Sequence, residues 1–121
     1  MSLGIVGIDH VQITVPSALE SECLVFYRSV LNLAEIPKPD ELRARGGAWF
    51  KLSNVQLHVG IDTGTSPASR RHVCFLVADI EGARAWARAQ KLAVEGEGAV
   101  TGSPRFFVHD PAGNRLEIAQ R

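Results

Sequence analysis

The chain has 121 residues, enough for one compact domain that buries about two thirds of the surface its unfolded form exposes. Its 13 basic and 13 acidic side chains balance, and a hydrophobic content of 45% is ordinary for a globular protein, so we expect neither nucleic acid nor a membrane as partner. Two cysteines, no long apolar segment and no signal-peptide pattern favour a cytoplasmic location.

The first half of the chain predicts the element order βαβββ, within a module of about residues 5–62. Residues 5–15 alternate polar and apolar side chains, as a strand with one buried face does, and Pro16 ends this strand. Ser17 and Glu20 have the spacing of a capping box, which predicts a helix over residues 18–31. Three short strands are then predicted at Ala34–Ile36, Ala48–Leu52 and Val55–Ile61.

The second half predicts the same order within a module of about residues 70–121. A strand at His72–Val77 leads to Asp79, a typical N-cap residue, and to a helix with one apolar face. Further strands are predicted at residues 93–95, 105–109 and 115–119. Residues 110–113 have the Asp-Pro-Ala-Gly composition of a tight turn. Residues 62–69, rich in Gly, Ser, Thr and Pro, form the predicted connection between the modules.

The two halves look like copies of one unit. When residues 9–15 are laid over residues 71–77, His10 coincides with His72. The last strands of the two halves align in the same way, and His58 then coincides with Glu117. The predicted fold is therefore α+β: two tandem βαβββ modules forming a curved, half-open mixed sheet around a polar cavity, with the helices outside, in one domain of residues 1–121.

Each strand that carries one of these four residues has one apolar and one polar face. A polar face open to water is the plain alternative, but such a face more often holds Lys, Glu and Thr. Imidazoles and a carboxylate at repeat-equivalent positions are the donors that a divalent metal needs. We therefore predict that His10, His58, His72 and Glu117 bind a metal ion.

Other side chains are weaker candidates for this cavity. Cys74 is predicted on the same face as His72, although a free cysteine is more often a small core residue. Four cationic side chains could bind an anionic substrate group if they point inward, although a solvated charge is the more frequent outcome: Arg45, Lys51, Arg105 and Arg115.

These segments together resemble the vicinal oxygen chelate superfamily, which contains glyoxalase I, fosfomycin resistance proteins, extradiol dioxygenases and bleomycin resistance proteins. The resemblance is carried by residues 9–11, 56–59, 72–79 and 110–117, with their Asp-Pro-x-Gly-Asn turn. It implies that the first and last strands of each half supply the ligands of Fe²⁺, Mn²⁺, Ni²⁺, Zn²⁺ or Co²⁺. It also implies a small-molecule substrate and a homodimer, with a site formed within one chain or across two.

The reaction that this resemblance favours is a glyoxalase-like, divalent-metal-dependent lyase or isomerase reaction on a small oxygen-chelating substrate. Glu117 and His58 are its predicted catalytic residues, and His58 is equally suited to be a fourth ligand or an acid and base beside the metal. An extradiol-type dioxygenase using Fe²⁺ is one alternative. A metal-free drug-binding protein of the bleomycin-resistance type is another. The sequence names no substrate.

Overall fold

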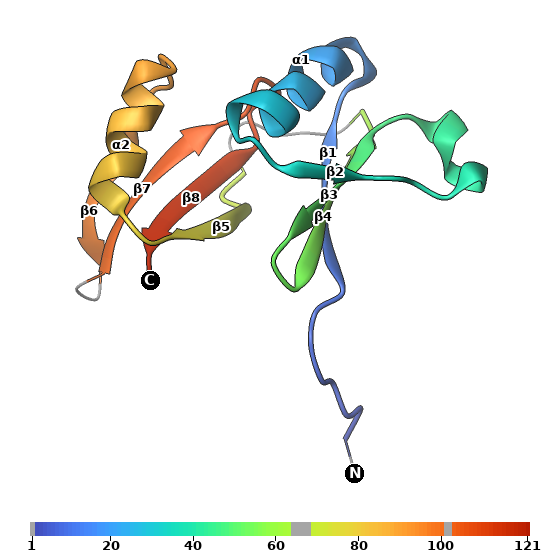
Figure 1. The fold of residues 1–121 in the computed structure, drawn as a ribbon, viewed down its shortest axis with the longest axis horizontal. Coiled ribbons are helices and arrows are strands. Elements are labelled where there is room, and N and C mark those ends of the chain that lie inside the picture. Colours follow the sequence, from blue (N-terminus) through green and yellow to red (C-terminus); the bar gives the residue numbers. More distant parts are fainter. Residues whose placement is uncertain (1, 64–68, 101–102) are drawn as a thin grey trace. The chain divides into compact units, whose positions relative to one another are not determined.

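The chain folds into two compact units, Met1–Gly64 and Thr65–Arg121. A computed structural model describes residues 2–63, 69–100 and 103–121. Each unit holds a four-stranded mixed sheet and helical segments in the order βαβββ (Figure 1). The predicted α+β class and the tandem βαβββ arrangement are therefore confirmed, whereas a single domain enclosing one polar cavity remains a prediction.

The first unit builds its sheet in the order β1-β4-β3-β2, with β1 and β4 parallel and the other neighbours antiparallel. Its strands are β1 (His10–Val15), β2 (Ala34–Ile36), β3 (Ala48–Leu52) and β4 (Val55–Ile61). Its helical segments are a 3-10 turn (Ser17–Leu19), α1 (Glu20–Val25), a π-helical turn (Phe26–Val30) and a second 3-10 segment (Asp40–Arg45).

The second unit repeats this topology in the order β5-β8-β7-β6, with β5 and β8 parallel. Its elements are β5 (His72–Val77), α2 (Ile80–Ala89), β6 (Glu95–Val100), β7 (Ser103–His109) and β8 (Arg115–Gln120). The strand register is repeated as well: His10 pairs with Gln56 in the first unit, and His72 pairs with Arg115 in the second. The internal repeat predicted from the sequence therefore has a structural counterpart.

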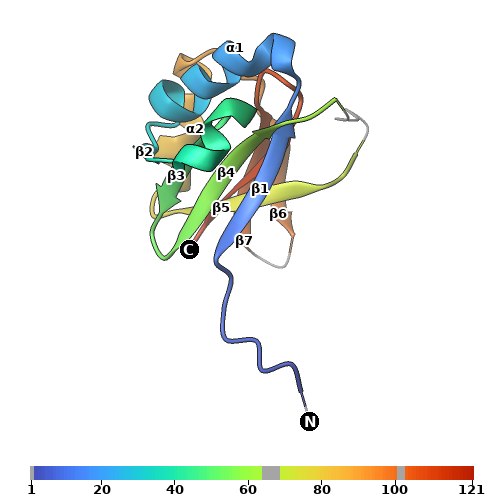
Figure 2. The same cartoon turned by 90° about the vertical axis from the view of Figure 1, so that its right-hand side faces the viewer.

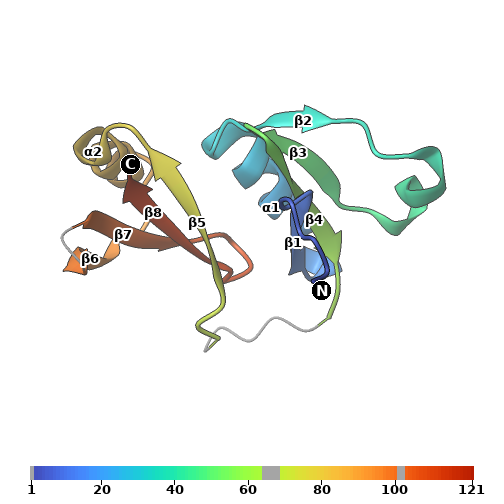
Figure 3. The ribbon, with the colours of Figure 1, turned by 90° about the horizontal axis from the view of Figure 1, so that it is seen from below.

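Apolar side chains on one face of each sheet make the core of that unit. In the first unit Tyr27, Phe50 and Leu57 are fully buried. In the second unit Phe106 and Leu116 are fully buried, and α2 packs on β7 and β8 (Figure 3). In the part of the chain that the structure describes, no helix combines the length and the apolar character that crossing a bilayer requires.

The N-terminal strand is shorter than the sequence predicts, beginning at His10 instead of residue 5. Its hydrogen-bonded neighbour within the sheet, β4, begins at Val55, and the pairing ends where the Gln56 amide donates to the Asp9 carbonyl at 3.2 Å, so β4 does not extend along the residues before Asp9. The segment before β1 therefore runs away from the first unit's sheet (Figure 2), and Leu3, Ile5 and Val6 are exposed. An alternating sequence pattern cannot show where the partner strand ends.

Three local predictions are corrected. The capping box is wrong, because Pro16 is the N-cap residue and the Glu20 carboxylate instead accepts a hydrogen bond from the Gly47 amide at 2.8 Å. The segment from Asp40 to Arg45 is helical, where no element was predicted. The strand predicted at residues 93–95 instead spans Glu95–Val100 and contains a register shift, since its glycine-rich sequence lacks apolar alternation.

The turn between β7 and β8 is held by the buried carboxylate of Asp110. One carboxylate oxygen accepts from the amides of Ala112 (2.9 Å) and Asn114 (2.8 Å), and the other accepts from the Asn114 side chain. Gly113 has a φ of 88°, which L side chains rarely adopt. This turn fixes where β8 starts and therefore where Glu117 lies.

Replacing Asp110 by alanine should lower the free energy of unfolding by about 2–3 kcal/mol, because two part-buried amides lose their acceptor. Urea denaturation of the variant and the parent protein measures this loss. Asp40→Ala, which removes an exposed carboxylate, should stay within about 0.5 kcal/mol of the parent. Equal stability of the two variants would contradict the role given to Asp110.

Candidate functional site

Strand alternation gives each unit one face that carries the residues predicted to be functional. In the first unit, Gln12 of β1 and Trp49 of β3 are both register partners of His58 on β4, which lies between them. In the second unit, Glu117 of β8 lies opposite Cys74 of β5 and Phe107 of β7. The face assignments predicted for these strands are therefore correct.

His58 lies in a stack of three aromatic rings in the first unit. The Trp49 ring is parallel to it at a centroid distance of 3.8 Å, and the His10 ring is nearly parallel at 4.1 Å. Two rings at these distances must cover opposite faces of the imidazole. His58 is only 5% exposed, and its Nε2 contacts the side-chain oxygen of Gln56 at 2.9 Å.

Burial, followed by the repulsion between positive charges on the His58 and His10 rings, lowers the pKa of His58. The ring is therefore neutral near pH 7. Because the Gln56 oxygen can only accept, Nε2 carries the single ring proton and Nδ1 keeps its lone pair. A neutral imidazole in this tautomer can accept a proton at Nδ1.

His10 is oriented by the carboxylate of Asp9, which lies 2.8 Å from its Nδ1. The Nδ1–H group donates to this carboxylate, which leaves Nε2 as the nitrogen with a lone pair. A carboxylate behind one ring nitrogen is the usual outer contact of a histidine whose other nitrogen binds metal. Asp9 itself is exposed, so this pair contributes little to stability.

The second unit brings His72, Glu117 and Arg105 together. His72 Nε2 lies 2.9 Å from one carboxylate oxygen of Glu117, and Arg105 donates to the other oxygen at 2.7 Å. Glu117 is only 5% exposed, so its charge is compensated by these two partners instead of by water. On its other side, His72 Nδ1 donates to the backbone carbonyl of Arg70 at 2.9 Å.

This network offers an imidazole nitrogen and a carboxylate oxygen, two donor types that bind divalent metals. The two atoms, His72 Nε2 and Glu117 Oε1, are separated by 2.9 Å. The two nitrogens of His72 face oxygen atoms on both sides, the Arg70 carbonyl at Nδ1 and the Glu117 carboxylate at Nε2.

The structure thus joins His10 to His58 and His72 to Glu117, each pair within one unit. In the described part of the chain, no group of three or more His, Cys, Asp or Glu side chains has the geometry to hold a metal ion. The set of four ligands therefore remains a prediction.

Arg105 is the residue whose role the sequence did not show. It was one of four cations that could point inward, and the structure gives it Glu117 as a partner. The signal was present in the alternation of β7, which puts Arg105 on the same face as Phe107, the register partner of Glu117. Arg115 instead covers the Phe107 ring, with its guanidinium carbon 3.7 Å from the ring centroid.

Cys74 is exposed, and it is the register partner of Glu117 on the same face of the sheet. Its predicted placement on this face is therefore confirmed, and it is not a core residue. Partial burial, the charge of Glu117 and a hydrogen bond to that carboxylate raise the pKa of its thiol. The sulfur is therefore protonated near neutral pH, which does not suit it to act as a nucleophile.

Comparisons with known proteins find similar sequences and similar folds. The family model described as Glyoxalase/Bleomycin resistance protein/Dioxygenase superfamily matches residues 7–118. A glyoxalase family protein from Bacillus anthracis is 40% identical, with a TM-score of 0.90 over 100% of this chain and 99% of the other.

Two more distant structures share the fold. Lactoylglutathione lyase from Agrobacterium tumefaciens is 21% identical, with a TM-score of 0.75 over 97% of this chain and 95% of the other. The fosfomycin resistance protein FosX from Listeria monocytogenes is 12% identical, with a TM-score of 0.76 over 97% and 94%. No curated protein sequence matches the chain.

Proposed function

Because the chain belongs to the Glyoxalase/Bleomycin resistance protein/Dioxygenase superfamily, we propose that it is a divalent-metal-dependent lyase or isomerase of the glyoxalase type. The superfamily consists mostly of enzymes, and divalent metals are common among its members. The substrate we propose is a small molecule that presents two neighbouring oxygen atoms. This proposal keeps the reaction class that the sequence predicts.

The observation that carries the proposal is the buried carboxylate of Glu117 between His72 and Arg105. Burying a carboxylate costs free energy because the charge loses its hydration, whereas an ion pair on the surface stays hydrated. Here His72 is oriented by a backbone carbonyl and Glu117 by a guanidinium, so both donor atoms are held in place before any ligand arrives. Such preorganisation is typical of a metal site.

We propose His10, His72 and Glu117 as ligands, a set of two histidines and one carboxylate that suits Fe²⁺, Mn²⁺, Ni²⁺, Zn²⁺ or Co²⁺. A bound ion of this kind polarises the oxygen atoms of a chelating substrate and so acidifies the adjacent C–H bond. Asp9 and Arg70 hold the Nδ1 atoms of the two histidines, which leaves both Nε2 atoms for coordination.

We assign His58 to proton transfer in preference to coordination. Its Nε2 donates to Gln56, and Trp49 and His10 cover its two faces, so the ring is fixed in place. Its lowered pKa keeps Nδ1 free to take up a proton at neutral pH. Glu117 is the second residue able to hold a proton during the reaction, as the sequence predicts.

Exchange of carbon-bound hydrogen for deuterium tests this reaction class. In D2O, the metal-loaded protein should exchange the C–H next to the carbonyl of a chelating α-hydroxyketone or of a 2-oxoaldehyde hemithioacetal, as seen by proton NMR. Oxygen consumption should stay at the background rate. Oxygen uptake with a catechol and Fe²⁺ would instead support a dioxygenase, and absence of metal binding would support a drug-binding protein.

Arg105→Met should weaken metal binding and slow turnover by about 10- to 100-fold, because Glu117 loses the contact that orients it. Metal titration and the exchange assay measure the two effects. Arg28→Met removes a guanidinium from an exposed ion pair with Glu35 and should change neither. An Arg105→Met protein with parental metal affinity would show that Glu117 is positioned without Arg105.

The homodimer and the cytoplasmic location expected from the sequence remain predictions. Light scattering from the purified chain tests the first of them.

A further inference from the structure

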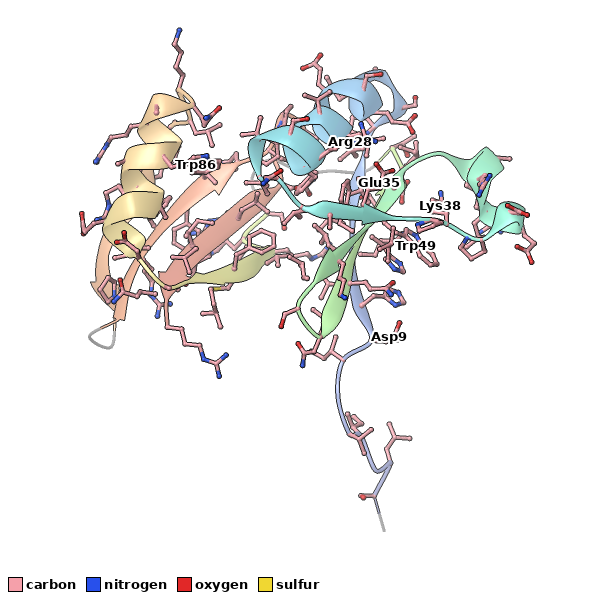
Figure 4. All side chains as sticks on the ribbon, in the orientation of Figure 1. Asp9, Arg28, Glu35, Lys38, Trp49 and Trp86 are labelled. Carbon is pink, nitrogen blue, oxygen red and sulfur yellow. The ribbon has the colours of Figure 1, made fainter. Side chains whose placement is uncertain are left out.

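A cleft of about 220 Å³ opens on the first unit, beside the stack that contains His58. It is lined by Gln12 of β1, Trp49 of β3 and Gly60 of β4, and by Lys38, Leu42 and Arg45 from the segment between β2 and β3. Figure 4 shows Lys38 on the segment after β2 and Trp49 on β3. This volume suits a small organic molecule.

The segment that brings Lys38 and Arg45 to the cleft is fastened to the sheet. Gly47 has a φ of 79°, and a Cβ at this position would collide with the carbonyl oxygen of Val59, so the backbone approaches β4 closely. The Gly47 amide donates to Glu20 at 2.8 Å, and the Lys38 ammonium donates to the Gly46 carbonyl. The two cationic side chains are therefore presented from a backbone with a defined position.

The charged side chains that line the cleft are both cationic. Of the residues that the structure describes along its walls, Lys38 and Arg45 are charged and none is acidic. Arg43, on the same 3-10 segment, lies 3.3 Å from Asp40, whereas Arg45 forms no ion pair with any described residue. A half-buried ammonium and a guanidinium without a counter-ion attract a carboxylate or a phosphate.

The cleft also adjoins the residues of the proposed reaction. The Trp49 indole that forms part of its wall is the ring stacked on His58 at 3.8 Å. Gln12 is the register partner of His58, and a Cβ on Gly60 would lie 2.7 Å from its amide nitrogen, so the absence of a side chain at Gly60 makes room for Gln12. A molecule in the cleft would thus contact Trp49, whose ring stacks on His58.

We propose that this cleft is the specificity site for a small organic anion, whose carboxylate or phosphate is bound by Lys38 and Arg45 and whose body packs against Trp49. This proposal rests on the function proposed above. It adds that the substrate carries an anionic carboxylate or phosphate besides the two neighbouring oxygen atoms that chelate the metal. Gln12 contributes a neutral hydrogen-bonding group beside the charged ones.

Calorimetric titration of the full chain, freed of metal by a chelator, tests the anion site without requiring turnover. The probes are benzoylformate, its neutral amide and phenyl phosphate. We expect both anions to bind and the amide to bind at least roughly tenfold more weakly. The anion that binds more tightly identifies the group for which the cleft is built. Because metal is absent, failure of the metal proposal would not affect this result.

Variants then locate the binding site. Arg45→Gln should weaken the binding of both anions roughly tenfold, and it leaves the fold undisturbed because this side chain is exposed. Lys38→Gln should do the same, although it also removes the contact with Gly46. Arg43→Gln, on the same segment but outside the cleft, should stay within about twofold of the parent.

The metal content of the Arg45→Gln protein should equal that of the parent, and any catalytic defect should appear in KM more than in kcat. Three results would overturn the proposal: no binding of either anion at millimolar concentration, equal binding of benzoylformate and its amide, or parental affinity in Arg45→Gln.

Discussion

Glu117→Gln should reduce turnover by at least about a hundredfold and remove most of the bound metal. The substitution keeps the size of the side chain and one of its oxygens but deletes the charge that His72 and Arg105 share at 2.9 and 2.7 Å. It should also lower the free energy of unfolding by about 1–3 kcal/mol, because the amide replaces a buried charged partner. Metal analysis, the exchange assay and urea denaturation measure the three effects.

The matched control makes the same chemical change on the surface. Glu35 also contacts an arginine at 2.7 Å, but this pair with Arg28 is solvent-exposed. Glu35→Gln should leave turnover and metal content at parental values and change stability by less than about 1 kcal/mol. If both variants lost activity equally, the loss would reflect general damage and not the position of Glu117.

Phe50→Ala should have the largest effect on stability, a loss of about 3–5 kcal/mol. Phe50 is fully buried on the apolar face of β3, and its ring lies 6.2 Å from that of Tyr27, which belongs to the helical segment on the same face. Removing the ring leaves a cavity where the helix and the sheet meet. Chemical denaturation followed by circular dichroism measures the loss.

Val25→Ala provides the comparison, because it also removes apolar atoms, but from a side chain that is 52% exposed. Its effect should stay below about 1 kcal/mol. A Phe50→Ala protein as stable as this control would mean that the first unit does not depend on its sheet-to-helix core. Expected instability in Phe50→Ala also explains why core positions are poor sites for testing function.

The strands were predictable where alternation and turn residues coincide. The predicted bounds are correct for three strands, Ala48–Leu52, Val55–Ile61 and His72–Val77. In each of them apolar positions repeat every second residue, and turn residues or the connection between the two halves mark the ends. The segment from Asp40 to Arg45 was missed because its six residues carry no apolar periodicity. Its conformation depends on contacts such as the one between Gly47 and Glu20, distant in sequence.

The internal repeat made one part of the candidate site predictable, namely which residues occupy equivalent positions in the two halves. The overlay of the halves identified His10 with His72 and His58 with Glu117, and alternation placed each on its polar face. The sequence could not show that Arg105 holds Glu117 or that Trp49 covers His58. Both contacts depend on which strands are neighbours and on their register, and alternation within a single strand specifies neither.

Metal analysis of the protein purified without chelator tests the central claim most directly. Mass spectrometry of the digested protein should find about one Fe, Mn, Ni, Zn or Co per chain, and a His72→Ala variant should lose most of it. A content below ~0.1 per chain after incubation with each of these ions, unchanged in His72→Ala, would contradict the claim.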